Sequence, residues 1–214
     1  MRRRPRRRAA RPHQDGPTGL SRPEADLAAL ALRLGIGPML VAHGSNKVWG
    51  AGGLEGTTKW FDHLGLRPAH LHARLAAATE ITAGAAVTLG VGAPLPEAAV
   101  IGLMATAART DHRGKGLFVF KGGWEYVGVV GLVAAVLARL GHGRWSLDRL
   151  VGRPTSGSIG AMAAAAALGV GAAAALLATS YHPSPPVEGP TAEPVSASDE
   201  EPAGTDGDPA PEVS

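Results

Sequence analysis

Residues 71–91 read LHARLAAATEITAGAAVTLGV, a long apolar stretch with one carboxylate, Glu80, well inside it. Within this stretch, no charged residue lies nearer to Glu80 than Arg74. The upstream stretch LAALALRLGIGPMLVA, at 27–42, embeds Arg33 in the same way. A charge at membrane depth is costly and tends to face protein or trapped water, so such residues mark candidate sites. The two stretches predict a small membrane protein with several spans and a polar interior.

A helix that crosses the hydrocarbon core needs about 20 apolar residues, or fewer where the bilayer is thinned. Five segments are candidates: 27–44, 71–91, 96–110, 124–140 and 157–179. The tight connection at 92–95 predicts that the second and third segments form an antiparallel hairpin. The predicted fold class is all-α, an integral membrane four-helix bundle with an added fifth, Ala-rich helix and disordered tails. Whether the Ala-rich segment crosses the membrane stays open, because Ala is only weakly membrane-seeking.

The two ends of the chain differ in charge. The N-terminal end is rich in Arg, and the C-terminal end is acidic and has no Lys or Arg. Both are rich in Pro or Gly and lack aromatic residues, which is typical of disorder. A block of Arg residues is typical of a segment that binds nucleic acid, and also of the cytoplasmic segment that precedes a first membrane span. The apolar segments downstream favour the second interpretation, so no nucleic-acid partner is expected.

The sequence therefore predicts four parts. Residues 1–26 form a disordered basic cytoplasmic tail, 27–150 a transmembrane bundle, 151–182 an additional Ala-rich transmembrane helix, and 183–214 a disordered acidic tail. The expected location is the cytoplasmic membrane, crossed several times, with the N-terminus inside. The segment 51–66 mixes aromatic and charged residues, which predicts a short amphipathic helix in the membrane interface.

With the N-terminus inside, ionisable groups from separate spans converge on the outer half of one bundle. The converging residues are Arg33, His43, Lys47, Glu80, His112 and Glu125. His43 and Lys47 lie four positions apart and so share one helix face. Two interpretations stay open. One is an internal ion-pair network that avoids isolated buried charge. The other is a pocket for a redox-active or anionic headgroup, in which Glu80 and His112 transfer protons.

In the second interpretation, Glu80 and His112 are the candidate catalytic residues. The candidate headgroup-binding residues are Arg33, His43, Lys47 and Glu125. The chain has no Cys, which excludes thiolate nucleophiles, iron–sulfur clusters and cysteine zinc sites within it. No metal site is predicted, and any redox role needs a bound cofactor or a partner subunit.

Several of these residues also carry a resemblance. Arg33-Leu34-Gly35, then His43-Gly44 and Lys47, resembles the opening signature of the DoxX family of small four-helix membrane proteins. Glu80 followed by Gly84 and Leu89-Gly90 is similar to that family's second helix, and His112, Gly122 and Glu125 continue the pattern. The stretch GHGRWSLD, at 141–148, is similar to the family's closing Gly-x-Gly-x-x-Ser-Leu-Asp. The resemblance covers residues 27–150.

The resemblance implies a subunit of a thiosulfate:quinone oxidoreductase in some relatives, and a partner of soluble redox enzymes in others. The expected function is therefore a redox-associated membrane subunit, a component of a quinone-linked oxidoreductase, with a polar intramembrane site. Quinone is the candidate cofactor, and the candidate partners are the lipid bilayer and a soluble redox enzyme or partner subunit. The alternative is a non-catalytic membrane scaffold that recruits soluble partners. The electron donor, the oligomeric state and any catalytic activity of the chain alone stay open.

Overall fold

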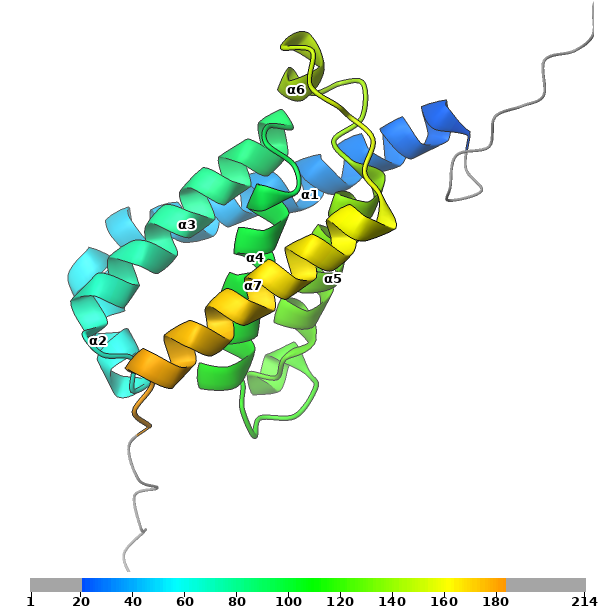
Figure 1. The fold of residues 1–214 in the computed structure, drawn as a ribbon. Coiled ribbons are helices and arrows are strands. Elements are labelled where there is room, and N and C mark those ends of the chain that lie inside the picture. The colour runs from blue at the N-terminus through cyan, green and yellow to red at the C-terminus, as the bar shows by residue number, and fades with distance from the viewer. Residues whose placement is uncertain (1–20, 184–214) are drawn as a thin grey trace, which may run out of the picture. The chain divides into compact units, whose positions relative to one another are not determined.

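The computed structural model describes residues 21–183, which contain helices and no strand (Figure 1). The all-α class predicted from the sequence is confirmed. The expected disordered tails lie outside the described residues, except for 21–26 and residue 183. The helices are α1 (Arg22–Trp49), α2 (Gly53–His63), α3 (Ala69–Leu89), α4 (Leu95–Thr110), the 3-10 turn η1 (Val119–Lys121), α5 (Glu125–Leu140), α6 (Leu147–Leu150) and α7 (Ile159–Ser180).

α1 begins earlier than the apolar pattern predicts, so that residues 22–26 are helical rather than part of a tail. Ser21 precedes the helix, and its backbone N–H donates to the Glu24 carboxylate at 2.8 Å. Pro23 follows in the first turn, where its fixed φ suits a helix start. This capping box satisfies backbone groups that the apolar stretch alone leaves open.

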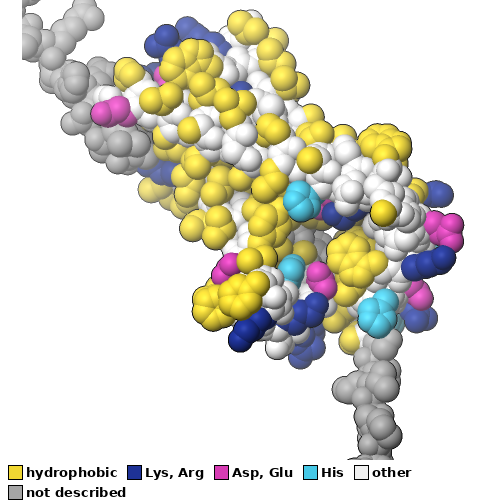
Figure 2. Space-filling view, turned by 180° about the vertical axis from the view of Figure 1, so that it is seen from behind, with side chains coloured by type: hydrophobic (Ala, Val, Ile, Leu, Met, Phe, Trp, Pro, Cys, Tyr) yellow, Lys and Arg dark blue, Asp and Glu magenta, His cyan; other side chains and the backbone are white. Residues whose placement is uncertain are grey.

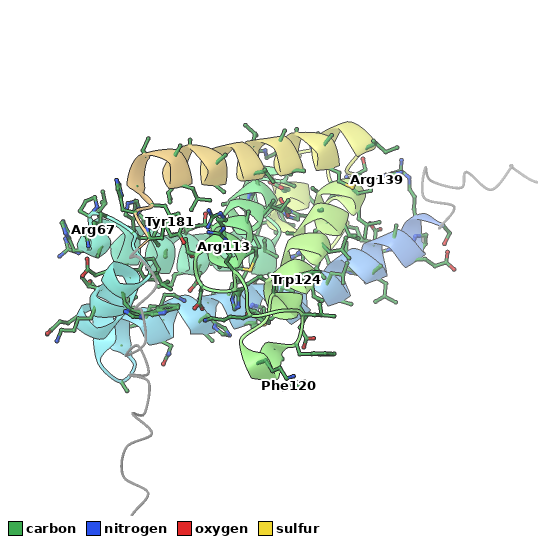
Figure 3. All side chains as sticks on the ribbon, turned by 90° about the horizontal axis from the view of Figure 1, so that it is seen from below. Arg67, Arg113, Phe120, Trp124, Arg139 and Tyr181 are labelled. Atoms are coloured by element: carbon green, nitrogen blue, oxygen red, sulfur yellow. The ribbon has the colours of Figure 1, made fainter. Side chains whose placement is uncertain are left out.

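The long helices run in alternating directions, so the bundle has two distinct ends. At the Lys47 end, α1 and α4 end and α3 and α5 begin. α7 also ends there, because Tyr181 forms an isolated bridge with Leu66. At the His142 end, α3 and α5 end and α4 and α7 begin. Figure 3 shows Arg67 and Tyr181 near the first end and Arg139 at the other.

Glycines set the close contacts between helices. A Cβ added at Gly84 of α3 would lie 2.8 Å from the carbonyl oxygen of Gly37 in α1. A Cβ at Gly169 of α7 would lie 2.5 Å from the Ala98 carbonyl oxygen and 2.9 Å from the Gly102 nitrogen, both in α4. Small residues at such positions let helix backbones approach closely in a membrane. α7 is therefore packed directly on α4.

This packing predicts opposite effects for two nearby substitutions. Gly169→Ala forces α7 away from α4, and overpacking of this kind costs about 1–3 kcal/mol. Gly171→Ala meets no atom within 4 Å, so the better helix propensity of Ala should stabilise by about 0.5–1 kcal/mol. Thermal unfolding in detergent measures both. Equal shifts for the two variants would contradict the α4–α7 contact.

The outward faces of the helices are apolar. Leu132 of α5 is 65% exposed and Leu168 of α7 is 55% exposed. Figure 2 shows hydrophobic side chains over the middle of one face and charged side chains mainly toward its ends. An exposed apolar surface of this extent is typical of a protein that contacts lipid.

Two of the five expected spans, α1 and α7, are long and apolar enough to cross a membrane by length and composition. α4 and α5 have 16 residues each, fewer than the usual 20 or so. α3 has 21 residues, but its polar residues, among them Arg74 and Glu80, make it less apolar. Within residues 21–183, two of the five predicted spans therefore have the length and composition of a membrane-crossing helix. Whether the other three cross the membrane stays a prediction.

α2 is the amphipathic helix expected within 51–66. Its buried Phe61 packs in a cluster with Leu66 and Ala73, and its Trp60 is 42% exposed. On the opposite face, Lys59 donates to Glu55 at 2.7 Å. This contact lowers the pKa of Glu55 and raises the pKa of Lys59. One apolar face and one charged face suit a helix that lies along the Lys47 end.

Candidate functional site

A cavity of about 730 Å³ lies among the helices and reaches the Lys47 end. Its lining comes from α1, α2, α3, α4, α5 and α7, together with residues that follow α2 and α4. Small-molecule sites usually fall between about 300 and 1,000 Å³. Of the six residues predicted from the sequence, four line it: His43, Lys47, Glu80 and His112.

Lys47 and Glu80 form the central contact of this cavity. The Lys47 Nζ donates to both carboxylate oxygens of Glu80, at 2.7 and 3.0 Å. The two side chains are only 16% and 8% exposed. Gly44, one turn before Lys47, makes this possible, since a Cβ there would lie 2.8 Å from the Glu80 Cβ. A nearly buried ion pair at a cavity wall offers a ligand both a donor and an acceptor.

His112 is oriented by the loop that leads into α5. Its Nδ1 lies 2.6 Å from the Gly122 carbonyl oxygen. A carbonyl only accepts, so Nδ1 carries a hydrogen, and in the neutral ring Nε2 then has the lone pair. The nearest charge to Nε2 is the Asp111 carboxylate at 3.8 Å. This arrangement leaves Nε2 able to take a proton, with Asp111 placed to stabilise the resulting imidazolium.

His43 lies beside an aromatic partner that the sequence did not indicate. Its ring centroid is 5.8 Å from that of Tyr126 in α5. The Tyr126 hydroxyl donates to the Met39 sulfur at 3.6 Å, and Tyr126 also lines the cavity. α1 and α5 thus present two ring side chains to the same space.

His72 is a cavity residue that sequence reasoning missed. It lies in the first turn of α3, near the start of the predicted second span, and is 7% exposed. Its Nε2 lies 3.2 Å from the Arg67 carbonyl oxygen and must donate to it. Its buried Nδ1 has no hydrogen-bond partner among the described residues. Since buried polar atoms are usually paired, this nitrogen is an acceptor that suits a ligand hydroxyl.

Arg33 does not join this cavity. Its buried guanidinium donates to four backbone carbonyls at 2.8–2.9 Å. Two belong to the last turn of α3, at Val87 and Thr88, and two to the loop after α5, at His142 and Trp145. Helix C-terminal carbonyls lack intrahelical partners and attract cations. Arg33 and Lys47 share a helix face, but fourteen residues separate them by about 21 Å along α1.

A second buried polar cluster surrounds this arginine, and the sequence did not reveal it. The His142 Nε2 lies 2.6 Å from the Glu97 carboxylate, and its Nδ1 lies 3.3 Å from that of Asp148. Asp148 also accepts from the Gly92 N–H at 2.8 Å. Two hydrogen bonds from one imidazole to carboxylates require an imidazolium, or a proton on one carboxyl. The cluster fastens the GHGRWSLD loop to the turn between α3 and α4.

Glu125 also lies outside the cavity, although its neighbour Tyr126 lines it. Consecutive helical residues differ by about 100° around the axis, so they face different surroundings. On the far side of His112, a more open groove of about 770 Å³ is lined mainly by α4 and α5, with Arg113 and Trp124 (Figure 3). This groove has no lining carboxylate, which makes the Lys47–Glu80 cavity the better candidate for proton chemistry.

One of three comparisons with known proteins found a match. The DoxX family model matches residues 28–113, from α1 to the residues after α4, and so includes Arg33, Lys47, Glu80 and His112. No curated protein matches the chain. No solved structure matches it either. The match shows a DoxX domain over residues 28–113, and together with the apolar helices it indicates a membrane protein.

Proposed function

We propose that the chain is a multi-pass subunit of the cytoplasmic membrane that binds a quinone headgroup for a redox partner. The observation that carries the proposal is the Lys47–Glu80 pair, nearly buried and lining a cavity that also contains His43, His72 and His112. A structural ion pair needs no adjoining space, whereas a binding site does.

The residues present suit a quinone. A quinone supplies a couple of two electrons and two protons, and its ring oxygens accept hydrogen bonds when oxidised and donate them when reduced. Lys47 donates to a ring oxygen and stabilises negative charge there. The free nitrogens of His72 and His112 accept from ring hydroxyls. Glu80 and His112 exchange the protons, as general acids and bases do. The chain has no Cys, so the electrons that reduce the quinone must come from a bound cofactor or from a partner redox protein.

The experiment compares quinone reduction in membranes that contain the wild-type chain, Glu80→Gln or Glu125→Gln. Glu125 is the matched control because it is a helix-borne carboxylate outside the cavity. We expect Glu80→Gln to reduce the rate about 10²-fold, the lower range for a lost acid–base group. Glu125→Gln should leave the rate unchanged. Equal rates in all membranes, including those without the chain, would contradict the proposal and favour a scaffold.

A further inference from the structure

Residues 144–153, which contain α6, form a hook with an apolar tip. In Figure 1, α6 stands out from the helices around it. The Arg153 N–H donates to the Asp148 carbonyl oxygen at 2.8 Å, so the residues between them form a closed tip. Leu150 and Val151 lie in this tip and are 79% and 70% exposed. Among the described residues, no large hydrophobic side chain is more exposed than Leu150.

Polar contacts fix the base of the hook to the bundle. The Asp148 N–H donates to the Gly90 carbonyl oxygen at 3.1 Å. The Asp148 carboxylate accepts from the Gly92 N–H at 2.8 Å. Just before α6, the Trp145 carbonyl oxygen accepts from the buried Arg33 at 2.9 Å. The tip is therefore held in one position, which lowers the entropy cost of binding through it.

Arginines accompany the apolar tip. Arg149 is exposed, and its side chain has no ion pair or hydrogen bond among the described residues. The Arg153 side chain is 59% exposed and lies 3.7 Å from the Asp148 carboxylate. The Arg144 guanidinium lies 4.8 Å from the centre of the Trp145 ring. The hook thus presents three arginines and buries its one carboxylate, which suits an anionic partner such as a phosphate.

The hook lies at the end of the bundle where both candidate membrane spans begin. α1 begins at Arg22, and its Asp26 carboxylate accepts from the Arg144 N–H at 3.2 Å. α7 begins at Ile159, shortly after the hook. In the orientation expected from the sequence, this end faces the cytoplasm, and the cytoplasmic leaflet carries anionic lipids.

We propose that the hook binds anionic phospholipid, with Leu150 and Val151 among the acyl chains and Arg149 and Arg153 at the phosphate. Amphipathic segments bind a membrane through buried apolar area and through attraction to anionic lipids, and the hook supplies both. Its position beside the starts of the two candidate spans favours lipid over a soluble protein. The inference goes beyond the proposed function, because no residue of the hook lines the cavity.

The test uses a fluorophore at position 150. The chain has no Cys, so Leu150→Cys gives a single attachment point. The labelled full chain is placed in lipid nanodiscs, and quenching by brominated phosphatidylglycerol is compared with quenching by brominated phosphatidylcholine. Both lipids should quench, and phosphatidylglycerol should be preferred at least about fivefold, the effect of one arginine near an anionic surface. Adding Arg149→Gln and Arg153→Gln should remove the preference.

Two controls accompany this comparison. Arg113→Gln with Lys121→Gln removes the same charge at the Lys47 end and should keep the preference at position 150. The same fluorophore at Lys59→Cys, on the charged face of α2, should be quenched little by either lipid. All substituted side chains are exposed, so thermal unfolding should match that of the wild type.

Three results would overturn the inference. An absence of quenching at position 150 by both lipids would mean that the tip lies in water, where it would suit a soluble protein instead. Equal quenching by the two lipids would mean that the hook does not distinguish anionic headgroups. A preference that survives the loss of Arg149 and Arg153 would mean that these arginines do not bind the phosphate.

Discussion

Arg33→Ala should lower the free energy of unfolding by about 3–5 kcal/mol, as loss of one partner from a buried charge network does. The substitution removes the donor to four carbonyls that are partly or wholly buried. It also removes a buried cation whose charge interacts with those of Glu97 and Asp148. The carboxyl groups of Glu97 and Asp148 would then have only the His142 imidazole as a buried partner.

Thermal unfolding in detergent measures this effect, with Arg74→Ala as the control. Arg74 lies on α3, the helix whose end Arg33 caps, but it is exposed. Its removal should change stability by less than about 0.5 kcal/mol. Arg33→Lys should recover only part of the loss, because an ammonium cannot reproduce the planar fork of donors. Full recovery with Lys would mean that charge alone, and not the four hydrogen bonds, stabilises this region.

The second large effect concerns Lys47 and Glu80. Lys47→Met leaves the Glu80 carboxylate 8% exposed and without its cation, so we expect a loss of about 3–5 kcal/mol. The double variant Lys47→Met with Glu80→Gln removes both charges and should recover most of that loss. The coupling between the two positions is measured by a double-mutant cycle in thermal unfolding. Additive losses would show that the pair is not coupled in the folded protein.

The helices were largely predictable from the sequence because apolar length and turn residues are local signals. The segments 71–91 and 96–110 match α3 and α4 to within two residues, and the hairpin between them follows from Gly90 and Pro94. The start of α1 was not predicted, because the Ser21–Glu24 capping box lies outside the apolar stretch.

The site was predictable only in part. His43 and Lys47 share one face of one helix, and their partners followed from the alternation of spans. Arg33 lies on the same face of α1 as Lys47 but far from it along the helix axis. A shared helix face therefore did not predict that Arg33 lies outside the cavity. Glu97 and His142 lie 45 positions apart, so no local pattern links them. Glu97 also occupies a first-turn position, where an acidic residue is ordinary.

The interpretation of the cavity depends on separating a structural ion pair from a binding site. Both explain a buried Lys47–Glu80 contact, and both predict a destabilised Lys47→Met variant. They differ for the double variant, in which the charges are gone and the fold is restored. If the pair is only structural, the double variant should bind a ligand as the wild type does. If the pair is a binding site, the double variant still lacks the Lys47 donor and the Glu80 carboxylate, and binding should be weaker.

The most direct measurement is therefore the dissociation constant of a tailless benzoquinone for the wild type and for the Lys47→Met/Glu80→Gln double variant. Our account predicts binding at least about tenfold weaker in the variant, since hydrogen bonds to charged groups contribute about 1.5–3 kcal/mol. The thermal stability of the two proteins should be similar. Equal affinities, with stability restored, would contradict a headgroup site at Lys47 and Glu80.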